Sequence, residues 1–297
     1  MATRIPFALV DVFAPSPLTG NPLALVPDAD AIDDDQMRAI AREFNQSETT
    51  FIVTPTRAGA AVRLRSFTPG GVEVLGAGHN AMGAWIWLAD TGRLDVHLVE
   101  FAQQIGDDVL PVRVQRRDGE QGVVTMRQSA PVFGATVTER DALALALGVE
   151  RNDLDEQSPT QVVSTGAGHL LVPVRDRDVV DRIAVDAARL IPLLEGAGGE
   201  GCYVYSRDPL DPAGGSVAYA RFFNPMVGIP EDPATGTAAG PLVAALVARR
   251  ELPEGVEAVV EQGYALGRPS RLRVAVHAGD VRLSGSGLIV AEGTLLL

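Results

Sequence analysis

The chain has 297 residues, which is enough for about two domains, each with its own hydrophobic core. Its formal net charge of -13 argues against a nucleic-acid partner, and 46% hydrophobic with 21% charged residues is typical of globular proteins. The single Cys202 excludes an intramolecular disulfide and a thiolate metal cluster. The start of the chain is unlike a signal peptide, and no apolar run is long enough to span a bilayer. We therefore expect a cytoplasmic protein without a membrane partner.

Short runs of β-branched and aromatic residues, bounded by Gly, Pro or Asp, predict mostly strands in the first half of the chain. These predicted strands cover residues 7–13, 23–26, 49–53, 62–67, 97–101, 112–115 and 122–127. A polar helix with an Asp-rich start is predicted over 33–44, and a second helix follows Gly78. The stretch 129–138, which contains Pro131 and Gly134, is the best candidate for a linker.

The second half repeats this pattern. Residues 139–147 open it, and its predicted strands cover 161–164, 170–174, 202–205 and 216–223, with others from Val256 onward. The final strand, 287–297, has no counterpart at the same place in the first half and is expected to cross back to it. The predicted domains are therefore 1–128 and 129–286.

One strand–turn–helix segment occurs twice. Phe67-Thr68-Pro69 aligns with Phe223-Asn224-Pro225, after which Glu73 aligns with Glu231 and Gly78 with Gly236. Three further segments match in the same order: 20–27 with 166–173, 48–54 with 200–206, and 106–114 with 267–274. Four matches in order predict duplication of a unit of roughly 150 residues.

Each half contains one strongly apolar segment at helical spacing, 81–88 in the first half and 242–247 in the second. A helix that is apolar on nearly all sides is expected to be buried. Strands wrapped around one central helix in each half satisfy this requirement. The predicted fold class is thus α+β, with two pseudo-symmetric domains.

Both central helices begin at a glycine, Gly78 in the first half and Gly236 in the second. Free amides and the helix dipole make such N-termini suitable for binding anions. We expect the two N-termini to face one interdomain cleft and to hold the ends of an anionic substrate. The alternative for the second helix is simple capping by Asp232 or Thr235.

Glu48 stands at the start of a predicted strand. A partly desolvated carboxylate near a cleft can have its pKa raised enough to exchange protons near neutral pH. The alternatives are a solvated strand-end residue for Glu48 and a structural histidine for His79. His97, His169 and His277 lack the spacing of metal ligands, so no metal site is expected.

Several of these motifs resemble the PhzF-like (phenazine-biosynthesis) family, and the resemblance covers essentially the whole chain. They are residues 11–13 with 20–22, 45–51, 78–79, 164–166 with 170–173, 231–240 and 267–270. The resemblance implies the fold of diaminopimelate epimerase, in which each domain is a strongly curved, mostly antiparallel, barrel-like sheet around a central helix. It also implies a cofactor-independent isomerase, often a homodimer, and the type enzyme moves a proton on a dihydro-hydroxyanthranilate.

By motif position, Glu48 resembles the family's catalytic acid/base, and His79 and Asp232 resemble residues that hold the substrate and share its protons. The residues that resemble substrate-binding groups are Gly78, Gly236 and Thr237. Thr237 replaces the usual serine and keeps its hydroxyl, whereas Asn80-Ala81 departs from the commoner small-residue-plus-threonine pattern. The two cysteines of the true epimerases are missing. The expected reaction is therefore proton transfer by Glu48 on a small carboxylate substrate.

Two other functions fit part of the sequence. Residues 76–81, with Glu100 beyond them, match the loose dinucleotide-binding fingerprint of a nicotinamide-dependent oxidoreductase. The strand before that fingerprint would be only 72–75 and would contain Glu73, whereas a buried parallel strand should be apolar throughout. A catalytically silent small-molecule-binding protein of the same fold is the second alternative, because fold and motifs do not guarantee turnover.

Overall fold

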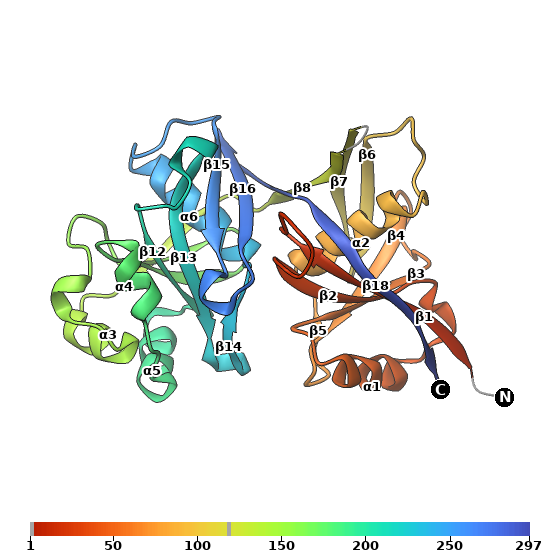
Figure 1. Ribbon diagram of the computed structural model, residues 1–297, viewed down its shortest axis with the longest axis horizontal. Helices are drawn as coiled ribbons and strands as arrows, with labels where there is room; N and C mark the ends of the chain where they lie inside the picture. Colours follow the sequence, from red (N-terminus) through yellow and green to blue (C-terminus); the bar gives the residue numbers. More distant parts are fainter. Residues whose placement is uncertain (1–2, 118–119) are drawn as a thin grey trace. The chain divides into compact units, whose positions relative to one another are not determined.

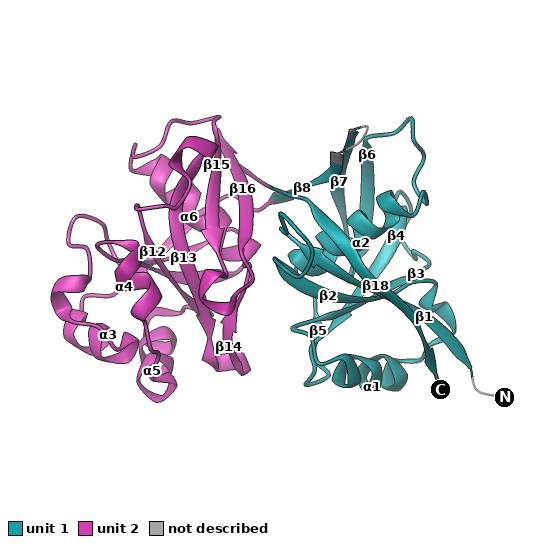
Figure 2. Cartoon of the chain, in the orientation of Figure 1, with its two compact units in different colours: residues 1–127, 284–297 teal, residues 128–283 magenta. Residues whose placement is uncertain are grey.

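The computed structural model describes residues 3–117 and 120–297. The chain divides into two compact units, which Figure 2 shows in teal and magenta. Unit 1 comprises residues 1–127 and 284–297, and unit 2 comprises residues 128–283. The C-terminal strand belongs to unit 1 because it pairs along its length with the first strand of the chain.

Unit 1 is a mixed, mostly antiparallel sheet. Its strands, in order across the sheet, are β18 (Gly287–Leu296), β1 (Arg4–Val12), β2 (Asn21–Val26), β3 (Thr49–Val53), β4 (Val62–Phe67), β6 (Glu100–Ile105), β7 (Asp108–Arg117) and β8 (Glu120–Gln128). Neighbours are antiparallel except for β2–β3 and β4–β6, which are parallel. The two-residue strand β5 (Glu73–Val74) pairs antiparallel with the end of β4.

Unit 2 repeats this arrangement. Its strands are β9 (Val132–Thr136), β10 (Gln161–Ser164), β11 (Gly168–Pro173), β12 (Gly201–Ser206), β13 (Ser216–Asn224), β15 (Glu257–Gln262), β16 (Ser270–His277) and β17 (Asp280–Gly285). The parallel pairs β11–β12 and β13–β15 stand where β2–β3 and β4–β6 stand in unit 1. The short strand β14 (Ile229–Asp232) pairs with β13 as β5 does with β4. The predicted duplication and α+β fold class are confirmed.

Each sheet surrounds one buried helix, α2 (His79–Asp90) in unit 1 and α6 (Gly236–Ala248) in unit 2 (Figure 1). All residues from 79 to 88 of α2 are buried, and so are residues 238–246 of α6. Gly83 lets α2 lie close to the sheet, since a Cβ there would come within 2.5 Å of the Leu23 side chain. The predicted central helices are therefore confirmed, and they place a helix N-terminus at a fixed position within each unit.

The remaining helices lie outside the two sheets. Unit 1 has η1 (Ala29–Ala31) and α1 (Asp34–Phe44), and unit 2 has α3 (Arg140–Leu147), η2 (Arg151–Asp153), α4 (Arg177–Arg182), α5 (Ala187–Ala197), η3 (Pro212–Gly214), η4 (Pro225–Val227) and η5 (Tyr264–Leu266). Of these helices, α1 was predicted from the sequence, whereas α3, α4 and α5 were not. Pro192 inside α5 is a poor helix former, so the packing of Leu190 and Leu194 into the core decides that helix.

The segment predicted as a linker contains a strand, and the turn before α6 contains two short elements. The predicted linker 129–138 contains β9, whose five residues are all exposed, so no alternation of apolar residues marks it as a strand. Its backbone pairing with β10 defines it. The turn 225–230 forms η4 and the start of β14, where Pro230 lies between the two paired positions and so loses no pairing bond.

Candidate functional site

The first group of candidate residues lies at the N-terminus of α2 in unit 1. His79 Nε2 lies 2.9 Å from Glu48 Oε2 and 3.4 Å from Ser47 Oγ. The side chains of His79 and Glu48 are only 10% and 16% exposed. Glu48 directly precedes β3, and α2 packs against β3, so the packing of helix on strand brings the two side chains together. Glu48 and His79, both predicted from the sequence as site residues, therefore form a largely buried acid–base pair.

The Glu48 carboxyl is held ionised by its neighbours. Burial is the largest single influence on its pKa and acts to raise it, but the charge and hydrogen bond of His79, with the hydrogen bond of Ser47, together outweigh it. The pKa of Glu48 consequently lies below its usual value. The expectation of a raised pKa is wrong, because it considered burial alone and not the imidazole that the fold brings to the carboxyl.

Asn80 closes the loop in front of α2. Its Oδ1 accepts a 2.7 Å hydrogen bond from the Gly78 amide, and its Nδ2 donates to Ser66 Oγ and Gly76 O. The expectation that Gly78 offers a free amide is wrong for this structure. The Gly78 amide is therefore occupied by the Asn80 side chain.

The second group lies at the N-terminus of α6 in unit 2. Thr235 occupies the N-cap position, yet its side chain makes no capping hydrogen bond; its hydroxyl donates to Asp232 Oδ2 at 2.5 Å instead. Gln262 fixes both residues, since its Nε2 donates to the Asp232 carbonyl and to Thr235 Oγ1. Capping of α6 by the Thr235 side chain is thus wrong, and Asp232 is a buried carboxylate in a fixed position.

Thr237, in the first turn of α6, pairs with a histidine. His169 Nε2 lies 3.1 Å from Thr237 Oγ1, and His169 is only 3% exposed. Burial lowers the pKa of His169 to about 4, so the ring is neutral near pH 7. This contact was not predicted from the sequence, where His169 was considered only as a metal ligand. A histidine at the start of an apolar strand was the available signal.

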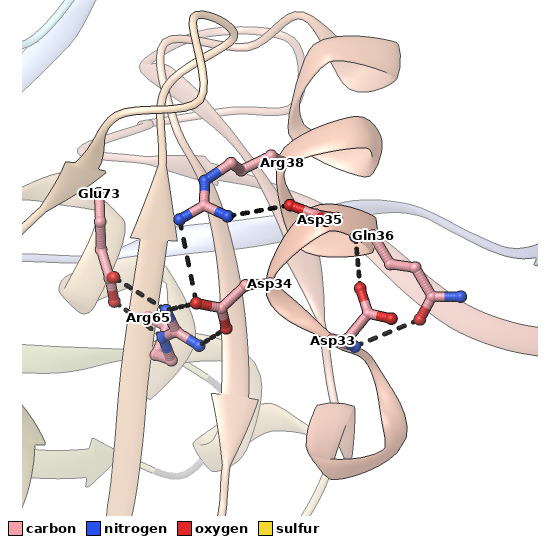
Figure 3. Close-up of polar contacts among 7 residues, drawn as sticks. All are labelled: Asp33, Asp34, Asp35, Gln36, Arg38, Arg65 and Glu73. Atoms are coloured by element: carbon pink, nitrogen blue, oxygen red, sulfur yellow. Dashed lines mark hydrogen bonds and ion pairs between the residues drawn. The ribbon is translucent and has the colours of Figure 1, made fainter.

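The two aligned glutamates hold the turns in place. Arg65 of β4 binds Glu73 and Asp34, with Nε–Oε1 and Nη1–Oδ1 distances of 2.8 and 2.6 Å (Figure 3). Arg221 of β13 binds Glu231 with an Nη2–Oε2 distance of 2.7 Å. Each pair ties a strand end to the turn that leads into a central helix. These glutamates thus hold the turns that lead into the two central helices.

The geometry does not suit a dinucleotide. The strand that precedes the fingerprint 76–81 is β5, which has two residues and runs antiparallel to β4. A dinucleotide-binding unit begins with a buried parallel strand instead. In residues 3–117 and 120–297, no three His, Cys, Asp or Glu side chains gather as metal ligands would, and no helix there is long and apolar enough to cross a membrane.

Comparisons with known proteins find relatives that match nearly the whole chain. Residues 10–293 match the family described as phenazine biosynthesis-like protein. The chain is 32% identical over 296 residues to trans-2,3-dihydro-3-hydroxyanthranilate isomerase from Pseudomonas aeruginosa, covering 98% of this chain and 99% of that protein. The enzyme of the same name from Pseudomonas fluorescens is also 32% identical, over 297 residues, with the same coverage.

Solved structures show the same similarity. A PhzF-family protein from Bacillus anthracis has a TM-score of 0.90 at 27% identity, covering 99% of this chain and 100% of that one. A hydroxyproline epimerase from Agrobacterium vitis has a TM-score of 0.65 at 14% identity, covering 99% of this chain and 91% of that one. The second similarity concerns the fold alone.

Proposed function

Because the chain is an isomerase that belongs to the phenazine biosynthesis-like protein family, we propose that it moves a proton on a small cyclic or hydroxy carboxylate by acid–base catalysis without a cofactor. The proposed substrate class is that of the Pseudomonas relatives, a dihydro-hydroxyanthranilate. The single observation that carries the proposal is the buried contact of 2.9 Å between Glu48 and His79.

The pair of Glu48 and His79 suits a reaction in which a proton is taken from one substrate carbon and returned to another. Glu48 is ionised before reaction, so it can accept a proton from an acidic carbon of the substrate. Once Glu48 is neutral, the adjacent imidazolium of His79 has lost its counter-charge and stabilises negative charge that develops on the substrate. The same imidazolium lowers the pKa of the newly protonated Glu48, which favours return of the proton at another carbon. A lowered pKa therefore makes Glu48 a weaker base but a stronger acid in the second step.

The residues of unit 2 are proposed to bind the substrate. The first-turn amides of Gly236 and Thr237 suit a carboxylate, because a helix N-terminus presents unpaired N–H groups and the positive end of the dipole. Asp232, fixed by Thr235 and Gln262, suits a hydroxyl or amino group that donates hydrogen bonds. The Gly78 amide is proposed to bind a substrate oxygen that displaces the Asn80 side chain. The Asp232→Asn variant should then raise KM more than it lowers kcat.

The test follows the proton. Wild type is incubated in heavy water with trans-2,3-dihydro-3-hydroxyanthranilate, and the product should contain solvent deuterium at the protonated carbon. Glu48→Gln keeps the shape of the side chain but cannot carry the proton, so turnover should fall by roughly 10²–10⁴-fold while binding persists. The matched control is Glu200→Gln. Glu200 is the exposed glutamate of unit 2 that aligns with Glu48, and in the described chain its side chain accepts a hydrogen bond only from the Gly168 amide.

Each outcome separates the alternatives. Near-normal turnover by Glu48→Gln would assign the base elsewhere, with Asp232 the next candidate. Tight binding by wild type without turnover or deuterium exchange would favour a silent binding protein. A homodimer in the cytoplasm remains part of the proposal, and sedimentation equilibrium of the purified chain measures the oligomeric state.

A further inference from the structure

We propose that His169 is a positioning residue that fixes the Thr237 hydroxyl as a hydrogen-bond donor toward a substrate oxygen. This inference rests on the proposed function, because it assumes that the N-terminus of α6 binds substrate. The starting observation is the 3.1 Å contact between His169 Nε2 and Thr237 Oγ1. Thr237 is partly exposed, whereas the histidine behind it is buried, so only the threonine can touch a ligand.

The packing around His169 fixes the plane of its ring. The Phe222 ring meets it edge to face, with centroids 4.9 Å apart and an interplanar angle of 81°. Phe222 itself sits over Gly201, where a Cβ would come within 2.5 Å of the Phe222 ring. Gly201 is also the residue that pairs with His169 between β11 and β12. A glycine at this position therefore makes room for the phenylalanine that orients the histidine.

The surroundings of the other ring nitrogen select the tautomer. His169 Nδ1 is buried and has no hydrogen-bond partner in the described chain. A neutral imidazole carries one N–H, and a buried N–H without an acceptor is costly. Placing the proton on Nε2 instead directs the only N–H at Thr237 Oγ1. The unpartnered Nδ1 is then a bare lone pair, which burial tolerates better than an orphan donor.

The tautomer decides what Thr237 can do. When His169 donates, the threonine oxygen is the acceptor, and the hydroxyl proton remains available for a ligand. When His169 accepts, that proton is spent on the ring and the hydroxyl can only accept from a ligand. A donor suits an oxyanion or a carboxylate, in line with the amides of the same helix turn. His169 thus gives the hydroxyl the same polarity as the helix N-terminus.

The first experiment reads the tautomer without any substrate. Long-range proton–nitrogen correlation spectra of the uniformly ¹⁵N-labelled protein at pH 7.5 resolve the imidazole nitrogens of its four histidines. The signals that His169→Phe removes belong to His169. We expect the proton on Nε2 and the chemical shift of a bare nitrogen at Nδ1. A proton on Nδ1 would overturn the proposal whatever the enzyme turns over.

The second experiment measures coupling with trans-2,3-dihydro-3-hydroxyanthranilate as substrate. Thr237→Val removes the hydroxyl and should lower kcat/KM by about 10²-fold, as loss of one oxyanion donor does. His169→Phe replaces the imidazole with another aromatic ring that can pack against Phe222 but cannot donate a hydrogen bond. It should lower kcat/KM at least tenfold. In the Thr237→Val background the same change should have less than a twofold further effect, because no hydroxyl is left to orient. Independent, multiplicative losses would overturn the positioning role.

A conservative variant separates positioning from folding. His169→Gln places an amide N–H near the position of Nε2 and should recover part of the activity that His169→Phe loses. Equal activity of the two variants would contradict the role of the donor. If wild type does not turn over this substrate, the proposed substrate class fails, while the tautomer measurement still decides the inference about His169.

Discussion

In unit 1 the central helix begins beside an ionisable pair, Glu48 and His79, whereas in unit 2 it begins beside a neutral pair, His169 and Thr237. The supporting frame is the same in both: an arginine on the strand before the turn binds a glutamate within it. Both units therefore have the arginine–glutamate pair before the central helix, but the side chains beside the helix N-terminus differ. The two units therefore differ in the chemistry beside the helix N-terminus, which is an ion pair in unit 1 and an uncharged contact in unit 2.

The arginine–glutamate pairs themselves differ in burial. In unit 2, both Arg221 and Glu231 are about 10% exposed, at 11% and 10%, and Arg221 also donates to three carbonyls at the end of α4 and just after it. Figure 3 shows Arg65 of unit 1 shared between Glu73 and Asp34. The side chains of Glu73 and Asp34 are 31% and 56% exposed. Water can replace more of the contacts of Arg65 than of Arg221.

The largest predicted effect breaks this frame. Arg221→Met leaves the Glu231 carboxylate and three carbonyls without their donor, so we expect a loss of about 3–5 kcal/mol in the free energy of unfolding. Arg65→Met should cost less, because its two carboxylates remain partly hydrated. Urea unfolding followed by circular dichroism measures both variants. An equal or larger loss for Arg65→Met would mean that burial does not distinguish the two pairs.

The next effect concerns His169 and the pH dependence of stability. The folded protein keeps His169 neutral down to a pKa of about 4, whereas the unfolded chain protonates it below about 6.5. Unfolding therefore takes up a proton in that window, and stability falls as pH falls from 6.5 toward 4. From pH 7 to pH 5 the contribution of this group is about 2 kcal/mol.

His169→Phe should remove that contribution. Urea unfolding at pH 7 and at pH 5 gives the loss of stability between the two pH values for each protein. This loss should be about 2 kcal/mol larger for wild type than for the variant. Identical pH dependence in wild type and variant would show that His169 is not held neutral in the folded state.

A smaller effect tests the ionisable pair of unit 1. In His79→Asn the charge that lowers the pKa of Glu48 is gone, and burial, the largest influence, then raises it. The base form of Glu48 is lost at a higher pH, so the acidic limb of the kcat/KM profile should move upward relative to wild type. The profile of Thr237→Val should keep the wild-type limb. An unchanged acidic limb in His79→Asn would show that His79 does not lower the pKa of Glu48.

The smallest predicted effect is at Cys202, which aligns with Thr50 of unit 1. The thiol is buried on β12, and burial raises its pKa to about 12, so almost no thiolate exists at neutral pH. Iodoacetamide at pH 7.5 should leave activity unchanged and label Cys202 only in urea. Rapid inactivation of the native enzyme, with labelling at this residue, would bring thiol chemistry back into consideration.

Local patterns in the sequence determined much of the fold. The strands 49–53, 62–67 and 161–164 were predicted with the bounds that the structure has, because each alternates or concentrates β-branched residues between clear boundaries. The repeated segments predicted the duplication, and the two apolar runs predicted the buried helices. Glu48 and His79 were found because each stands at the end of a regular element.

Only the tertiary structure decided how those residues act on one another. The sequence places Glu48 and His79 31 positions apart and His169 and Thr237 68 positions apart, so no local pattern reveals either contact. The direction of the pKa shift at Glu48 depends on the imidazole that packing brings to it. Strand β9 likewise exists through backbone pairing with β10, which its exposed side chains do not encode. Hydrogen bonds and charges act over a few ångströms in space, and the fold alone sets which groups come that close.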